Sequence, residues 1–359
     1  MAQSVMAHLA ALRPILLGLV IGTIGGVVFI WLNMPLPWML GAMTATTIAS
    51  IAGVRQRMPG NLRSVMVVVL GVMLGSSFTP DIVQHMAAWV VSLIGVAIYV
   101  VLCTGLVMVM FRKWLGHDPL TAFLCATPGG ASEMVILGIT MGADERAIAL
   151  SQASRVLIVM LAIPFWFRFV EGYIPPAQVS ADFEIFTLGI ADMALLAGCG
   201  VVGAVGAHWL GIPVPAMIGP LFVSAAAHIA GLSDHRPPWE LVAVAQVVLG
   251  TAVGCRFAGV SAQTIVRTLG TGIVSSAILL AMTTVFSYGL YRLTGLGMQG
   301  LVLAFAPGGL AEMNLIALAM GIDPAFVSTH HTARICIVVI FMPWLLRLYV
   351  RHVLPPGSQ

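Results

Sequence analysis

The chain has 359 residues, of which 60% are hydrophobic and only 8% are charged, and its formal net charge is +3. Soluble domains carry about 25% charged residues, so this composition excludes an ordinary water-soluble globular protein. Most of the basic residues lie at the ends of hydrophobic stretches, a pattern that suits lipid headgroups and argues against nucleic acid as a partner.

Several stretches exceed the roughly 18 apolar residues that indicate a membrane-spanning helix. The first half of the chain contains six hydrophobic segments, at residues 14–32, 37–53, 62–78, 83–111, 120–141 and 146–170. The second half contains six more, at 185–210, 215–231, 241–257, 264–291, 298–320 and 325–350. The stretch 171–184 is polar and acidic and contains prolines, so we place the boundary there. The expected organisation is a membrane repeat at 1–172, a linker at 173–184 and a second membrane repeat at 185–359.

The second half repeats the first. Pro35 and Pro37 in LNMPLPWMLGAMTATTIASIAG match Pro213 and Pro215 in LGIPVPAMIGPLFVSAAAHIAG. Further on, ATPGGASEMVILGITMGAD matches FAPGGLAEMNLIALAMGID, and one inserted residue accounts for the whole register. A register kept over most of each half indicates an internal duplication.

The fold class that we expect is an all-α polytopic membrane protein with about 10 to 12 spanning segments. The two repeats are parallel if all six segments of each half cross the membrane, and inverted if the fifth segment re-enters. Basic residues at segment ends place both termini in the cytoplasm under either topology. We favour inverted repeats.

Each fifth segment is interrupted by one motif, Pro128-Gly129-Gly130 in the first half and Pro307-Gly308-Gly309 in the second. Proline removes a helix donor and glycine weakens a helix, so a broken or re-entrant helix is expected there. Irregular backbone at membrane depth is tolerated only inside the protein or beside a water-filled cavity. Two breaks at corresponding positions point to the central site of a transporter. The alternative is a simple packing kink.

Carboxylates follow both breaks, in Ser132-Glu133-Met134 and Ala311-Glu312-Met313. A glutamate in an apolar segment is costly unless it faces a polar cavity or has a partner. The N-terminus of the half-helix favours its ionised form and desolvation favours its neutral form, so a group able to exchange protons is expected. The alternative is a structural role as a helix cap or in a salt bridge.

Arg155 and Arg334 lie about a third of the way into the sixth segments, and an arginine at that depth should face the protein interior. Each either binds an anionic group of a substrate or neutralises Glu133 or Glu312, and both roles stay open.

The halves differ beside these arginines, because Gln152 aligns with His331 and Val135 with Asn314. We therefore expect an asymmetric site in which His331 is the additional titrating group. The candidate substrate- or ion-binding residues are Gly129, Gly130, Ser132, Glu133, Gln152, Arg155, Gly308, Gly309, Glu312, Asn314, His331 and Arg334.

The adjacent pair His330-His331 is not expected to bind a metal, since neighbouring helical residues face different ways and no further ligand has suitable spacing. The five cysteines all lie in hydrophobic segments and are interpreted as packing residues. Phosphate loops, nucleophile elbows and zinc motifs are missing from the sequence, so we expect no cofactor and no enzymatic activity.

The two copies of PGG-x-x-EM, the P-x-P-x-x-x-G segments before them and the overall length resemble the AbrB family of bacterial membrane proteins. The resemblance covers nearly the whole chain and implies the same duplicated hydrophobic domain. Members carry labels as regulators of aidB expression or as ammonia monooxygenases, but this sequence lacks a cluster of ligands for copper or iron and a segment long enough for a soluble DNA-binding domain.

The function that we expect is secondary transport of a small solute, such as an organic anion or another metabolite, coupled to protons at a site where the two repeats meet. The alternative is a membrane-embedded sensor or regulator that affects gene expression through a partner. The expected partners are a small-molecule substrate and membrane lipid, without nucleic acid, and a homodimer stays open. The resemblance implies the bacterial inner membrane as the location.

Overall fold

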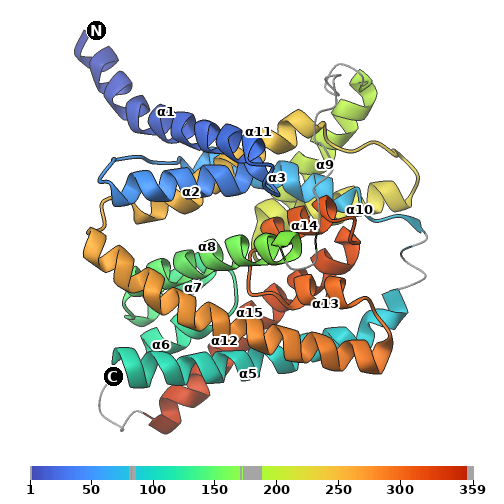
Figure 1. Ribbon diagram of the computed structural model, residues 1–359. Coiled ribbons are helices and arrows are strands. Elements are labelled where there is room, and N and C mark those ends of the chain that lie inside the picture. The colour runs from blue at the N-terminus through green and yellow to red at the C-terminus, as the bar shows by residue number, and fades with distance from the viewer. Residues whose placement is uncertain (1, 81, 83–85, 170–171, 173–187, 354–359) are drawn as a thin grey trace. The chain divides into compact units, whose positions relative to one another are not determined.

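The computed structural model describes residues 2–80, 82, 86–169, 172 and 188–353, and every regular element in these ranges is a helix (Figure 1). The first half of the chain contains α1 (Ala2–Trp31), α2 (Pro37–Ile51), α3 (Gly60–Gly75), the 3-10 helix η1 (Met86–Trp89), α5 (Val90–Leu115), α6 (Pro119–Ala126), α7 (Ala131–Met141) and α8 (Glu145–Phe169). The second half contains α9 (Ile190–Trp209), α10 (Pro215–Ile229), α11 (Trp239–Gly254), the 3-10 helix η3 (Cys255–Phe257), α12 (Ala262–Thr294), α13 (Met298–Phe305), α14 (Leu310–Ala319) and α15 (Pro324–Val353).

Seven helical stretches in the described residues are long and apolar enough to cross a membrane. They are Leu12–Trp31, Met86–Leu115, Glu145–Phe169, Ile190–Trp209, Trp239–Phe257, Ala262–Thr294 and Pro324–Phe341. Large apolar side chains such as Leu16, Ile24 and Val27 of α1 are more than half exposed, which suits a lipid environment. The predicted all-helical, multi-pass membrane protein is confirmed, and the number of 10 to 12 spans stays a prediction.

The chain forms two compact units, and each contains residues from both halves of the sequence. Unit 1 comprises residues 1–83, 160–267 and 318–321, and unit 2 comprises residues 84–159, 268–317 and 322–359. This spatial division differs in kind from the sequence division at 1–172 and 185–359, which stays a prediction. The proposed linker at 173–184 lies outside the described residues.

Close approaches between glycines join neighbouring helices in unit 1. Gly25 of α1 lies against Gly41 of α2, and a Cβ atom on either would collide with the carbonyl oxygen of the other. Gly203 of α9 lies against Gly219 of α10 in the same way, and a Cβ on Gly203 would be 2.5 Å from the Gly219 carbonyl carbon. Small residues let helix backbones approach closely, which is a main source of packing energy for helices in lipid.

Unit 1 also joins the two halves of the chain through their second and third helices. Gly71 of α3 packs on α10, where a Cβ would lie 2.7 Å from the Met217 carbonyl oxygen, and Gly250 of α11 packs on the backbone of α2 at Met39. Hydrogen bonds reinforce both contacts. Ser50 Oγ of α2 donates to the Gly254 carbonyl at 3.0 Å, and Ser224 Oγ of α10 donates to the Val72 carbonyl at 2.8 Å.

The two Pro-x-Pro motifs place a bulky residue in the left-handed backbone region. Leu36 precedes α2 with φ 47°, and Val214 precedes α10 with φ 49°. A positive φ is unfavourable for any residue with a Cβ and most unfavourable for a β-branched one. The following proline occupies the first turn of each helix, where its missing N–H costs nothing. Tertiary packing therefore holds both turns against local strain.

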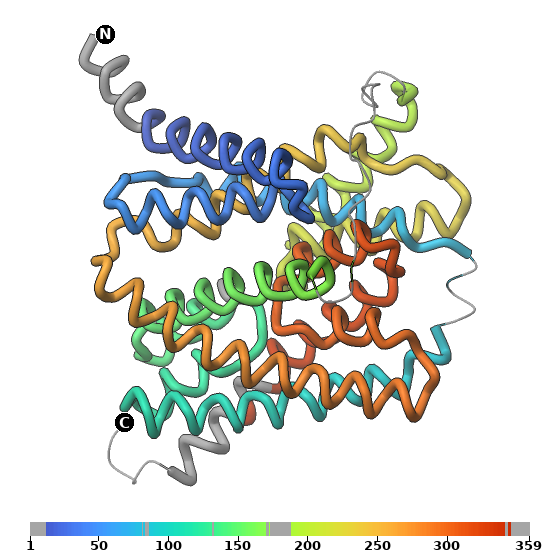
Figure 2. Tube along the Cα trace, viewed as in Figure 1, coloured from blue at the N-terminus to red at the C-terminus, as the bar shows by residue number. Residues whose placement is uncertain are grey.

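In unit 2, α5 packs against α6 and α15, and α13 packs against α15 (Figure 2). The side chain of Tyr99 on α5 is fully buried, and its hydroxyl is hydrogen-bonded at 2.9 Å to Thr283 of α12. Its ring lies edge-on to Phe305 of α13 with 5.4 Å between ring centres. Ser92 of α5 is hydrogen-bonded to His330 of α15 at 2.7 Å. Helix α5 thus connects three helices of the second half.

Candidate functional site

Both Pro-Gly-Gly motifs lie between two short helices of unit 2. Helix α6 ends at Ala126 and α7 begins at Ala131, and α13 ends at Phe305 and α14 begins at Leu310. The first residues after α6 and α13, Thr127 and Ala306, have extended ψ angles of 122° and 138°. Carbonyl groups at these helix ends have no partner within a continuing helix and must find other donors.

Arg155 of α8 supplies donors to the first break. Its Nη2 donates to the Thr127 carbonyl at 3.1 Å, and its Nη1 lies 3.4 Å from the Ala126 carbonyl oxygen. The side chain is only 4% exposed, so its charge is held inside the protein. The five donors of a guanidinium in a planar fork suit this kind of bridging between carbonyls.

Arg334 of α15 supplies donors to the second break at shorter distances. Its Nη1 donates to the Ala306 carbonyl at 2.6 Å, and its Nη2 donates to the Gly308 carbonyl at 2.7 Å. The side chain is 3% exposed. Unit 2 therefore buries two positive charges, one at each break.

The halves were predicted to differ at Gln152 and His331, and these two side chains are direct hydrogen-bond partners of the arginines. Gln152 Nε2 donates to the Leu124 carbonyl at 2.9 Å, and Gln152 Oε1 accepts a hydrogen bond from Arg155. His331 Nε2 is 2.9 Å from the Leu303 carbonyl oxygen, and its Nδ1 is 2.9 Å from Arg334 Nη2. Both side chains are fully buried. An amide and an imidazole thus occupy the same place in the two halves and fasten an arginine to the end of a short helix.

The glutamates fold back onto the breaks that precede them. A Cβ at Gly130 would collide with the Glu133 carboxylate, and one at Gly309 would collide with the Glu312 carboxylate. Each glutamate is in the first turn of its short helix and half-buried. The positive end of the helix dipole stabilises a carboxylate there.

No ion pair joins either buried arginine to a glutamate among the residues that the structure describes. The open alternative in which Arg155 or Arg334 neutralises Glu133 or Glu312 therefore has no contact to support it. The guanidinium Nε atoms of both arginines also lack a hydrogen-bond partner within the described part of the chain.

The remaining predicted residues lie close to the same breaks. A Cβ at Gly129 would be 2.6 Å from Val338 Cγ1, so the first break packs against α15. Asn314 is fully buried, its Nδ2 donates to the Leu310 carbonyl at 2.7 Å, and its Oδ1 has no partner among the described residues. The side chain of Ser132 lies outside the described part. Within that part, no group of three His, Cys, Asp or Glu side chains could hold a metal ion.

Two residues near the arginines were missed by the sequence reasoning. Tyr99 and Cys103 of α5 are fully buried and lie in the neighbourhood of Arg334. Both lie in an unbroken apolar segment, where a tyrosine and a cysteine look like ordinary packing residues. Their four-residue spacing, which puts them on one face of α5, was the available signal.

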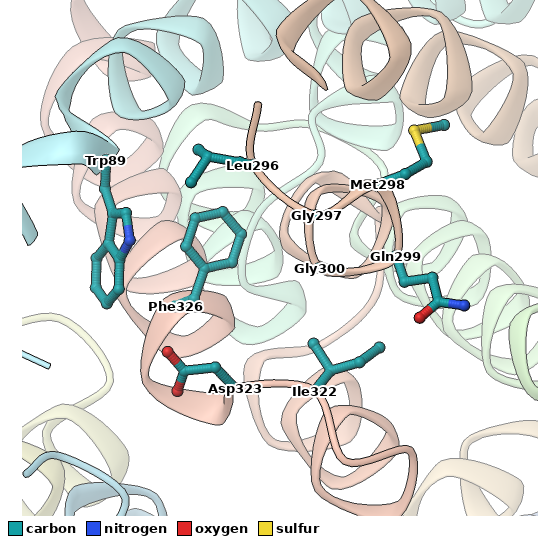
Figure 3. A pocket seen from close by; sticks show the side chains of 9 residues that line it. All are labelled: Trp89, Leu296, Gly297, Met298, Gln299, Gly300, Ile322, Asp323 and Phe326. Atoms are coloured by element: carbon teal, nitrogen blue, oxygen red, sulfur yellow. The ribbon is translucent and has the colours of Figure 1, made fainter. Parts of the chain in front are cut away.

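A cavity of about 530 Å³ opens beside the N-terminus of α15 (Figure 3). It is lined by Trp89, Leu296, Gly297, Met298, Gln299, Gly300, Ile322, Asp323 and Phe326. Trp89 and Phe326 form an edge-to-face pair with 5.3 Å between ring centres, and Phe326 lies 4.1 Å from the ring centre of His330. Phe326 thus lines the cavity and packs on His330, the residue before His331 in α15.

A family model described as "Transition state regulatory protein AbrB" matches residues 38–350. The chain belongs to the AbrB family. The match includes both Pro-Gly-Gly breaks and both buried arginines of the site described above, and it confirms the resemblance drawn from the repeated motifs.

Two relatives extend this comparison. A protein of Bacillus subtilis (strain 168) named "Uncharacterized protein YhjN" is 28% identical over 360 residues, which cover 91% of each chain. A protein of Escherichia coli (strain K12) named "Putative regulator AbrB" is 24% identical over 330 residues, which cover 89% of this chain and 91% of the relative. This member of the AbrB family is thus similar to both relatives along nearly its whole length.

Proposed function

We propose that this protein is a secondary transporter of a small anionic solute, coupled to protons, with its binding site at the two breaks in unit 2. One observation carries the proposal: Arg155 and Arg334 are almost completely buried and bonded to backbone carbonyls, with no ion pair to a carboxylate among the described residues. Buried charges in membrane proteins mark solute and ion pathways because they are too costly to keep for packing alone.

An anion is the solute that this arrangement favours. Two guanidiniums supply donors in the planar fork that matches carboxylate or phosphate oxygens. Helices α7 and α14 begin at the breaks, and the N-terminus of a helix attracts negative charge. Bound between these groups, an anion would offset the positive charge that the carbonyl contacts only partly compensate.

Matching contacts in the two halves support a mechanism of alternating access. Gln152 and His331, which are aligned in the sequence, each bond to the last turn of a short helix, and each also bonds to its arginine. We read α6 with α7, and α13 with α14, as one broken segment in each repeat. Broken helices at corresponding positions of inverted repeats form the central sites of several transporter folds.

Glu133 and Glu312 have a coupling or gating role in this scheme. Each carboxylate lies over the glycine at which its break ends, so it is placed to compete with an arriving anion for the same helix N-terminus. Protonation of a carboxylate would remove this competition. The location in the bacterial inner membrane and the cytoplasmic termini are parts of the same proposal.

The test is uptake of labelled acetate, succinate, phosphate and sulfate into proteoliposomes, with and without an imposed pH gradient. Wild type is expected to accumulate at least one of these anions with the gradient. Arg155→Gln and Arg334→Gln keep a donor but remove the charge and are expected to lower uptake at least about tenfold, which corresponds to 1.4 kcal/mol. Arg292→Gln, at the exposed end of α12, is the matched control and should transport like wild type.

Glu133→Gln and Glu312→Gln complete the series and are expected to lose dependence on the pH gradient. Absence of uptake of every anion by wild type would contradict the proposal, as would full uptake by both arginine variants.

The name of the Escherichia coli relative supports a second candidate, a membrane-embedded sensor that acts through a partner. A sensor binds its solute without moving it across the membrane. Binding of an anion that raises the melting temperature, together with no flux in proteoliposomes, would favour this candidate over transport.

A further inference from the structure

We propose that His331 is the group that takes up the coupled proton, and that it does so only in partnership with the anion held by Arg334. This inference rests on the proposed function, places the coupled proton on His331 and leaves Glu133 and Glu312 with the gating role. The starting observation is the position of His331, a fully buried side chain with one ring nitrogen on a backbone carbonyl and the other on the guanidinium of Arg334.

The two contacts fix the proton on the neutral ring. The Leu303 carbonyl can only accept, so His331 Nε2 carries the hydrogen and donates across 2.9 Å. Arg334 can only donate, so His331 Nδ1 is unprotonated and accepts across 2.9 Å. The neutral imidazole therefore satisfies both neighbours. Its one acceptor lone pair, on Nδ1, is the one that accepts from Arg334.

A second proton can bind only at that lone pair. It would turn Nδ1 into a donor facing the donor Nη2 of Arg334, and it would place two positive charges side by side. The hydrogen bond between them would be lost, while Nε2 would keep its bond to Leu303. One N–H of Arg334 Nη2 would then be available to a bound anion, while Nη1 keeps its bond to the Ala306 carbonyl and Nη2 keeps its bond to the Gly308 carbonyl.

An anion at Arg334 reverses this penalty. Its negative charge offsets the charge added to His331 and gives Arg334 a new acceptor. Binding of the proton and binding of the anion are therefore mutually favourable, and such coupling is reciprocal by thermodynamic necessity. The proton binds at Nδ1 with the anion and leaves from Nδ1 after the anion departs, so the ring returns to its starting state.

The first half of the chain contains a natural comparison. Gln152 makes the corresponding contacts, with its amide nitrogen on the Leu124 carbonyl and its amide oxygen accepting from Arg155. An amide cannot take up a proton in the physiological range, so Arg155 stays fastened at every pH. Only the arginine in the second half responds to protonation.

The charged and titratable groups around His331 agree with this assignment. Arg334 and His330 lie on the same helix, and helix α13 contributes only the Leu303 carbonyl. Helix α14 carries Glu312, whose carboxylate is folded back over Gly309. From the other packed helices come Tyr99 and Cys103 of α5 and Arg155 of α8, which interact with Arg334 or with each other. Among the contacts described for these groups, the one that reaches His331 Nδ1 is that of Arg334.

The test substitutes the residue that the chain itself uses at the aligned position. His331→Gln should fold, because Gln152 makes the same pair of contacts. Affinity for succinate, phosphate and sulfate is measured by thermal shift on the purified full-length protein at pH 6, 7 and 8. Wild type is expected to weaken by up to about tenfold per pH unit for the anion that binds, as one linked proton requires. His331→Gln is expected to change less than about twofold over the same range and to lose accumulation driven by a pH gradient, while still exchanging labelled for unlabelled anion at equal pH.

Gln152→His is the reciprocal variant and carries the test if His331→Gln does not fold. It places a second protonable group beside Arg155 and should steepen the pH dependence of affinity. If His331→Gln keeps the wild-type pH dependence, or if Gln152→His leaves it unchanged, the assignment to His331 is overturned while anion transport stands. If wild type binds none of the probes at any pH, the proposed function is overturned and the assignment with it.

Discussion

The glycine pair between α9 and α10 allows a quantitative test of unit 1. In Gly203→Ala, the added Cβ would lie 2.5 Å from the Gly219 carbonyl carbon and 2.5 Å from Pro220 N. Carbon atoms in favourable contact are about 3.5–4.0 Å apart, so the helices would have to separate locally by about 1 Å. The neighbouring atoms belong to the backbone and cannot rotate away as a flexible side chain could.

Overpacking of a well-packed site costs about 1–3 kcal/mol, and a collision with backbone belongs at the upper end. Alanine gains about 0.5–1 kcal/mol over glycine inside a helix, which partly offsets the cost. The expected net loss is roughly 2 kcal/mol for Gly203→Ala. Gly206→Ala on the same helix is the matched control, because no atom of the described residues outside its own helix turn lies within 4 Å of its added Cβ.

The assay is thermal unfolding in detergent, followed with a thiol-reactive dye that reports exposure of the buried Cys103, Cys125 and Cys199. With about 2 °C per kcal/mol, Gly203→Ala should lower the midpoint by roughly 4 °C, and Gly206→Ala should leave it unchanged or raise it slightly. Equal midpoints for the two variants would refute the close packing of α9 on α10.

Three further predictions concern unit 2. Partial burial alone would raise the pKa of the Asp118 carboxyl, but hydrogen bonds from the Thr121 hydroxyl and from the N–H groups at the start of α6 outweigh it and lower the pKa. The ionised cap therefore stabilises the fold above the ordinary carboxyl pKa, and this stabilisation is lost as the pH falls through the lowered pKa. Asp118→Ala should cost about 1 kcal/mol at pH 7 and progressively less in melting curves below pH 4. A difference between variant and wild type that stays constant with pH would contradict this origin. Tyr99→Phe should cost about 1 kcal/mol in the same assay, because Thr283 loses the hydroxyl that donates to it, and an unchanged midpoint would contradict that bond. Arg334→Lys keeps the charge but loses the fork between two carbonyls, so anion affinity should fall at least about tenfold, and wild-type affinity would show that charge alone suffices.

Much of the candidate site could be predicted because polar residues stand out in apolar segments. The two Pro-Gly-Gly motifs, both arginines and the substitution of His331 for Gln152 were all visible as departures from a hydrophobic background. The partners of the arginines could not be predicted in the same way. Sequence reasoning weighed a substrate against a glutamate, and the structure instead places backbone carbonyls around Arg155 and Arg334. A linear pattern does not reveal which helix end faces which side chain.

The fold was predictable at the level of segments and less so at the level of packing. The first hydrophobic segment was predicted at 14–32, and the apolar stretch Leu12–Trp31 agrees with it, although α1 itself begins at Ala2 and includes Pro14. A proline removes one helix hydrogen bond and can be accommodated by a bend, so it is a weak stop signal in a long apolar helix. Contacts of α2 with α11 and of α3 with α10 depend on residues far apart in the chain, and hydrophobic periodicity carries no information about them.

The packing of first-half helices on second-half helices in unit 1 has a consequence for synthesis in the cell. The Ser50 hydroxyl and its acceptor, the Gly254 carbonyl, are 204 residues apart in the chain. At about 5–20 residues per second, α2 waits roughly 10–40 s for α11 to be made. During that time the glycine face of α3 and the small-residue face of α2 have no partners, and lipid or a chaperone must cover them. The two halves of unit 1 therefore reach their final packing together, late in translation, although α1, α2 and α3 are made first.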